Sequence, residues 1–190
     1  MSVHAQDRPP QILEVYRDYL KPNGVAANRK LENRAEQLCG KLGFAHAYLT
    51  IESMSGPAEM WYLNGFESEA EVAKLRREYQ QNSRLASALN EIVQRKAALK
   101  RAESTDEFSY YRPDLSRGDP WIIGRGRFLV ITFVRDDLPL DGTVFEMKDG
   151  SRMVVRSMET FAEARALARS AGSSARLFCS YYFFRPVARR

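Results

Sequence analysis

The chain has 190 residues, of which 44% are hydrophobic and 28% charged, and its formal net charge is +5. This composition is that of a globular protein and excludes a disordered or fibrous chain. The most apolar run, residues 128–134, is far shorter than the roughly 20 residues of a membrane-spanning helix, so no membrane partner is expected.

The inventory of reactive residues is small. Two cysteines and two histidines cannot complete a convincing zinc site, so neither a metal nor a cofactor is expected. Acidic and basic residues alternate around 69–78, which is typical of a solvated helix face, and no nucleic-acid-binding motif accompanies the positive charge. We therefore expect no nucleic-acid partner.

The N-terminus indicates a cytoplasmic protein, because no charged segment precedes an apolar stretch there. Val3-His4-Ala5 resembles the end of a signal peptide, however. A periplasmic or secreted protein therefore remains an alternative.

The first part of the chain, residues 10–112, predicts an alternation of strands and helices. Apolar periodicity, turn residues and helix caps place the boundaries, with Ser68 and Asn82 as N-caps. In chain order we expect strand 11–20, helix 28–42, strands 44–52 and 59–66, a helix from Ser68, a helix from Asn82, and a strand at 108–112. This order predicts a ferredoxin-like βαββαβ module of the α+β class.

Residues 113–126 are rich in turn formers and are interpreted as a connector. The remainder, 127–187, predicts a smaller ββ(β)αβ module with a hairpin around Lys148-Asp-Gly150. Its helix should begin with a capping box formed by Thr160 and Glu163. Because Val15–Leu20 and Phe133–Leu138 are similar, we interpret the second module as a shortened, degenerate repeat of the first.

Two segments of the first module carry a family resemblance. Tyr16-Arg-Asp-Tyr-Leu-Lys-Pro-Asn-Gly24 and Trp61-Tyr-Leu-Asn-Gly-Phe-Glu-Ser68 are similar to the first and third strands of the dimeric α+β barrel superfamily, which includes antibiotic-biosynthesis-monooxygenase-like and NIPSNAP-like proteins. The resemblance implies a barrel formed by two sheets, across a homodimer or within a tandem chain. It also implies a small, often aromatic or haem-type ligand in the lumen, and in some members oxidation without a bound cofactor.

The haem-degrading branch of that superfamily is not carried over. Asn64, Trp61 and His46 have the residue types of that branch, but their positions do not match its pattern.

Alternation along the predicted strands separates two faces of the sheet. Residues 45, 47, 49 and 51 are small or aliphatic and are expected to lie beneath the helices. Their neighbours His46, Tyr48 and Glu52 then share the opposite face with Tyr16. An aromatic and polar face of this kind is typical of a ligand cavity or an interface between subunits.

This face supplies the candidate site. His46 is the predicted catalytic base, because its unperturbed pKa of about 6.5 suits proton transfer near neutral pH; a strand histidine satisfied by its neighbours is the alternative. The predicted ligand-binding residues are Tyr16, Tyr48, Glu52, Trp61, Asn64, Tyr110 and Arg112.

The sequence thus predicts an α+β barrel protein that binds a small apolar or aromatic molecule. As an enzyme it would be a cofactor-independent monooxygenase or isomerase. The alternative is a non-catalytic protein whose aromatic sheet face serves only for self-association, as a homodimer.

Overall fold

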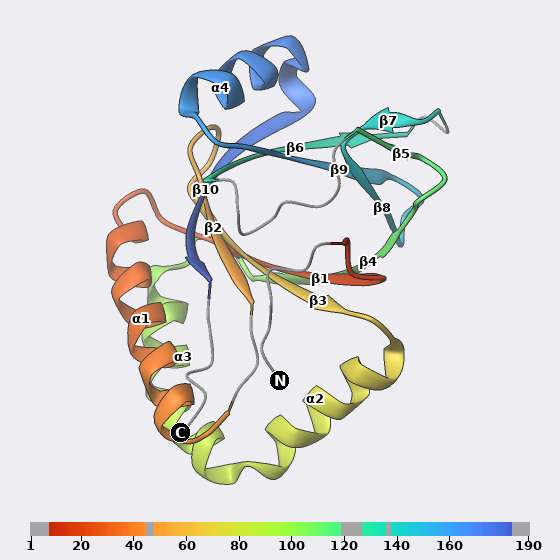
Figure 1. The fold of residues 1–190 in the computed structure, drawn as a ribbon. Helices are drawn as coiled ribbons and strands as arrows, with labels where there is room; N and C mark the ends of the chain where they lie inside the picture. The colour runs from red at the N-terminus through yellow and green to blue at the C-terminus, as the bar shows by residue number, and fades with distance from the viewer. Residues whose placement is uncertain (1–7, 45–47, 119–126, 136–137, 184–190) are drawn as a thin grey trace.

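The computed structural model describes residues 8–44, 48–118, 127–135 and 138–183. Within these residues the protein is an α+β structure in which eight antiparallel strands close into one barrel and four α-helices lie outside it (Figure 1). The barrel strands are β1 Ile12–Tyr19, β2 Leu49–Ser53, β3 Glu59–Phe66, β4 Thr105–Tyr111, β6 Phe128–Val134, β8 Thr143–Met147, β9 Arg152–Met158 and β10 Ala175–Phe183. The short strands β5 (Ser116–Arg117) and β7 (Leu140–Asp141) form a separate parallel pair.

The strand order around the barrel is β1-β3-β2-β10-β6-β9-β8-β4. The two halves of the chain have the same strand order. The neighbours around the barrel are β4-β1-β3-β2 in the first half and β10-β6-β9-β8 in the second, which is in both cases the fourth, first, third and second strand of that half. The halves are joined by two seams, β2 with β10 and β4 with β8. One chain therefore closes the barrel without a second copy.

The α-helices are α1 Val25–Lys41, α2 Glu69–Gln81, α3 Ser83–Leu99 and α4 Phe161–Ser170. Three of these four α-helices of the described residues begin at the predicted caps, whereas α1 begins at Val25, three residues before the expected start, and has no side-chain cap. Ser68 and Asn82 accept hydrogen bonds from the first turns of α2 and α3, and Thr160 forms the expected capping box with Glu163. The β8–β9 hairpin turns through Gly150, whose φ of +78° is a conformation that favours glycine.

The barrel interior is a dense apolar core, to which alternate residues of all the strands contribute. Tyr111 of β4 packs against it, and its buried members are Leu13, Val15, Leu49, Ile51, Trp61, Leu63, Leu129, Ile131, Phe145, Met147, Met153, Val155 and Phe178. The structure thus reverses the predicted assignment of the two faces. Leu49 and Ile51, expected beneath the helices, fill the barrel, because a closed barrel needs its most apolar face inside.

The aromatic and polar face instead lies outward, beneath α1 and α3 (Figure 1). Tyr62 of β3 is buried there at the centre of a polar network: its hydroxyl accepts hydrogen bonds of 3.1 Å from Asn28 and from Lys96 and donates one of 3.3 Å to Asp18. Lys96 also pairs with the buried carboxylate of Glu32. The face that was expected to enclose a ligand or a second subunit is therefore covered by the helices of its own chain.

The Glu32–Lys96 pair gives a stability prediction. Replacing Lys96 by Met keeps the aliphatic stem but leaves a buried carboxylate without its cation, so the free energy of unfolding should fall by about 3 kcal/mol. Urea denaturation followed by circular dichroism measures this change. Lys74→Met is the control, because Lys74 and Glu78 are 3.9 Å apart and both mostly exposed, so the loss there should stay below about 0.5 kcal/mol. Equal losses in the two variants would contradict the prediction.

Candidate functional site

The barrel wall is incompletely closed at one seam. β4 pairs with β1 from Thr105 to Tyr110 but with β8 only from Ser109 to Tyr111. In an antiparallel ladder alternate residues direct their backbone groups to the same side. The Tyr111 N–H donates to Gln11 beside β1, and the Arg112 N–H donates to Val144 of β8. By alternation the backbone groups of Phe108 and Asp106 face the β8 side, where no strand of the described residues pairs with them.

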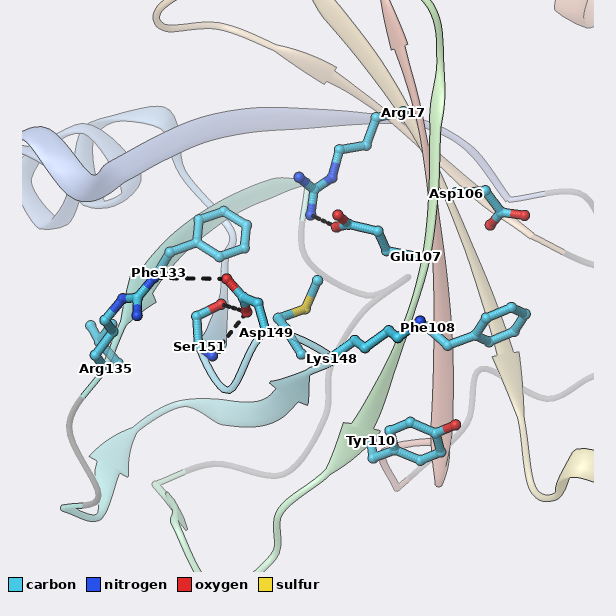
Figure 2. Close-up of a pocket in the computed structure, with 12 residues that line it drawn as sticks. Arg17, Asp106, Glu107, Phe108, Tyr110, Phe133, Arg135, Lys148, Asp149 and Ser151 are labelled. Carbon is cyan, nitrogen blue, oxygen red and sulfur yellow. Dashed lines mark hydrogen bonds and ion pairs between the residues drawn. The ribbon is translucent and has the colours of Figure 1, made fainter.

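A pocket of about 980 Å³ opens at this gap. It lies at the barrel end where β1 and β6 finish and β4 and β9 begin. Figure 2 shows residues of β4 on one side and of the β8–β9 turn on the other. The lining residues are Arg17, Asp106, Glu107, Phe108, Tyr110, Phe133, Val134, Arg135, Met147, Lys148, Asp149 and Ser151.

Arg17 is the innermost cation of the pocket. Its position on β1 follows Leu13 and Val15 at intervals of two, so its side chain points into the barrel. The guanidinium carbon lies 4.4 Å from the centre of the Trp61 ring and 5.4 Å from that of Phe133. Cation–π attraction to both rings holds the guanidinium in place at the inner end of the pocket.

The guanidinium has unused hydrogen-bond donors. Its side chain is only 14% exposed, and its single ion pair among the described residues joins Nη2 to Oε2 of Glu107 over 3.0 Å (Figure 2). Nε and Nη2 are both fully buried and make no hydrogen bond of good geometry within the described part of the chain. Leaving buried donors unsatisfied is costly, which makes this group the most unusual one in the pocket.

The lining of the pocket contains as many basic as acidic residues: Arg17, Arg135 and Lys148 against Asp106, Glu107 and Asp149. The side chain of Asp106 points to the other face of β4, away from Glu107 and Arg17 (Figure 2). Arg135 and Asp149 lie 3.9 Å apart at the rim. Lys148 extends from the β8–β9 turn towards β4 (Figure 2).

The carboxyl groups differ in their acidity. Burial raises the pKa of Asp106 above its ordinary value, although the charge of Arg76 acts in the opposite direction. The hydrogen bond from the Ser151 hydroxyl holds the pKa of Asp149 below its ordinary value. Asp106 is thus the better proton acceptor of the two.

Most of the predicted ligand-binding residues lie away from this pocket. Tyr16 packs beneath the helices against Tyr62, with ring centres 5.9 Å apart, and Tyr48 donates a hydrogen bond to Glu32. Burial, with the nearby carboxylate of Glu32, raises the pKa of Tyr48 above its ordinary value. Both tyrosines therefore serve the interface between sheet and helices.

The polar residues among the predicted ligand-binding residues also form ion pairs and hydrogen bonds on the outer surface of the barrel. Glu52 forms an ion pair of 2.7 Å with Arg29 of α1, and Asn64 donates a 2.9 Å hydrogen bond to Glu14. Arg112 pairs with Asp114 and with Glu146 of β8.

Two predicted residues do lie at the site. Tyr110 lines the pocket and donates a hydrogen bond of 2.9 Å to Glu69 of α2. Trp61 is buried in the barrel, where it supports Arg17. His46 lies outside the described residues, so its catalytic role stays a prediction.

Sequence reasoning missed the charged residues of the pocket, Arg17 and Glu107 above all. A signal for Arg17 was present, since it interrupts the inward-facing apolar series that begins with Leu13 and Val15. Nothing local marks Glu107, because its position beside Arg17 depends on the register of β4 with β1, in which Glu107 pairs with Val15 and Thr105 with Arg17.

The fold and the pocket define an α+β barrel protein with one open end. No family model matches the chain, and no curated protein matches it. Among solved structures, the chain is similar to a protein of Fusobacterium nucleatum subsp. nucleatum named "putative monooxygenase". The TM-score is 0.55 with 6% sequence identity, over 92% of this chain and 94% of the other. At this identity the similarity shows a shared fold.

Neither a membrane-spanning helix nor a cluster of metal-ligand side chains is present in the described residues. None of the helices there combines the length and the apolar character needed to cross a membrane. The same part of the chain contains no group of three or more acidic, histidine or cysteine side chains placed to hold a metal ion.

The carboxyl groups around β4 give a pKa prediction. Burial and the charge of Asp106 both raise the pKa of Glu14 above its ordinary value. Asp106→Asn should therefore lower the pKa of Glu14, as measured by a carboxyl ¹³C NMR titration. Asp149→Asn is the control and should leave that pKa unchanged, because Asp149 does not contribute to the shift at Glu14. An unchanged pKa in Asp106→Asn would contradict the prediction.

Proposed function

We propose that the protein binds a small organic anion with an apolar or aromatic body in the open end of its barrel. The observation that carries this proposal is the buried guanidinium of Arg17, which stacks on Trp61 and has donors that no described residue satisfies. An anionic oxygen supplies the acceptors that Arg17 lacks.

The walls of the pocket suit the rest of such a ligand. Phe133, Met147 and Val134 provide apolar surface, and the β4 backbone groups that pair with no strand of the described residues offer additional hydrogen bonds. Sites for small molecules typically combine apolar walls with a few polar groups that orient the ligand. The volume of about 980 Å³ is at the upper end of the usual range.

As a reaction class we propose cofactor-independent oxidation, with dioxygen as the second substrate, or isomerisation. The name of the structural neighbour and the resemblance of residues 10–112 support this class. Either reaction needs a base that removes a proton from the bound molecule. His46, which lies outside the described residues, stays the predicted base.

We further propose that each half of the chain is a ferredoxin-like unit and that the protein is a tandem member of the dimeric α+β barrel superfamily. The strand order shared by the two halves supports this assignment. The division at residues 113–126 stays a prediction, as does a homodimer.

A binding experiment tests the proposed function. The probe is 2-naphthoate, an aromatic carboxylate, titrated into the protein by isothermal calorimetry. Arg17→Gln should weaken binding by about 10-fold to 100-fold, the usual worth of a hydrogen bond to a charged group.

The matched control is Arg112→Gln, because Arg112 also pairs with a glutamate but lies outside the pocket. This variant should bind the probe as the wild type does. Thermal unfolding establishes that both variants are folded. No binding by the wild type, or equal binding by Arg17→Gln, would overturn the proposal.

A further inference from the structure

The contact between Arg17 and Glu107 bears on which anion the pocket accepts. The guanidinium atoms without a good hydrogen bond are Nε and Nη2. These two nitrogens form one edge of the guanidinium, and their N–H bonds point in nearly the same direction. That edge matches the two oxygens of a carboxylate, which it holds by two parallel hydrogen bonds.

Glu107 uses this edge only partly. Its Oε2 lies 3.0 Å from Nη2, while Nε has no partner among the described residues. Figure 2 shows the two side chains turned towards each other from β1 and β4. The carboxylate of Glu107 therefore already occupies a position beside the guanidinium, but it contacts only one of the two nitrogens.

Glu107 is free to leave this position. Its side chain is 44% exposed, whereas that of Arg17 is 14% exposed and is held against two aromatic rings. Rotating the Glu107 side chain away from Arg17 into the solvent costs little free energy, because its carboxylate regains hydration. Moving Arg17 would break its stacking and expose Trp61.

The charge balance of the pocket favours a ligand with a single negative charge. A monocarboxylate that replaces Glu107 at the guanidinium keeps the charge there unchanged. A dianionic phosphate would bring a second negative charge into a pocket whose lining also includes Glu107 and Asp149.

We infer that Glu107 is a specificity-determining residue that occupies the place of the ligand's carboxylate in the free protein, so that the pocket selects monocarboxylates able to displace it. This inference rests on the proposed function and names the ligand class of the same pocket. Glu107 acts as an internal competitor: it keeps Arg17 neutralised when the pocket is empty and lowers the apparent affinity for every anion. Only a ligand that engages both Nε and Nη2 makes better use of the guanidinium than Glu107 does.

Calorimetric titration of Glu107 variants tests the inference. In Glu107→Gln the competing charge is absent, so 2-naphthoate should bind about 5-fold more tightly, while the neutral isostere 2-naphthamide should show no change. Glu146→Gln is the matched control, because Glu146 pairs with Arg112 outside the pocket and is similarly exposed. In the Arg17→Gln background, Glu107→Gln should no longer improve binding.

Two further measurements address the ligand class. Arg17→Lys retains the positive charge but loses the two-nitrogen edge, so it should weaken 2-naphthoate binding about 10-fold. The wild type should bind 2-naphthyl phosphate more weakly than 2-naphthoate.

The outcomes separate this inference from the proposed function. If Arg17→Gln weakens binding but Glu107→Gln leaves it unchanged or weakens it, Glu107 is not a competitor and the inference falls while the proposed function stands. Wild-type binding by Arg17→Lys, or tighter binding of the phosphate, would overturn the selection of monocarboxylates. If Arg17→Gln binds as the wild type does, the proposed function falls as well.

Discussion

The packing of a closed eight-stranded barrel governs the rest of this structure. A barrel of eight strands is just wide enough inside for side chains, and in this protein the inward positions of the strands are filled by a buried apolar cluster. Trp61, Phe145 and Phe178 are the largest of the fully buried residues that fill it. A ligand can then enter only where the wall opens, and the divergence of β4 from β8 provides that place. The location of the pocket is thus a consequence of the core.

The same constraint explains why the outer face of the sheet beneath α1 and α3 is polar. Asp18 of β1 lies on that face, and Glu32 of α1 and Lys96 of α3 reach it from the helices. Each buried charge there has an opposite charge or a hydroxyl within contact distance, as buried charges require. The helices are held by specific polar contacts in addition to apolar packing, which fixes their position on the sheet.

Local signals in the sequence were sufficient for much of the fold. The strand at 59–66, the hairpin around Gly150 and the caps at Ser68, Asn82 and Thr160 were predicted correctly, because each depends on neighbouring residues. The two faces of the sheet were exchanged, because alternation reveals that the faces differ but not which of them is enclosed. Closure of the barrel decides that question, and closure is a property of the whole chain. For the same reason the pocket, which joins residues of β1, β4, β6 and the β8–β9 turn, could not be assembled from any one segment.

The two seams between the halves are unequal. β2 and β10 pair along the whole of β2, whereas β4 and β8 pair over three residues only. In a barrel made of two identical subunits, symmetry would repeat any opening at both seams. Joining the halves in one polypeptide removes this symmetry constraint. The β2–β10 seam can then be fully paired while the β4–β8 seam stays partly open. The expected stoichiometry is accordingly one ligand per chain, and binding should be free of the cooperativity that paired identical sites allow.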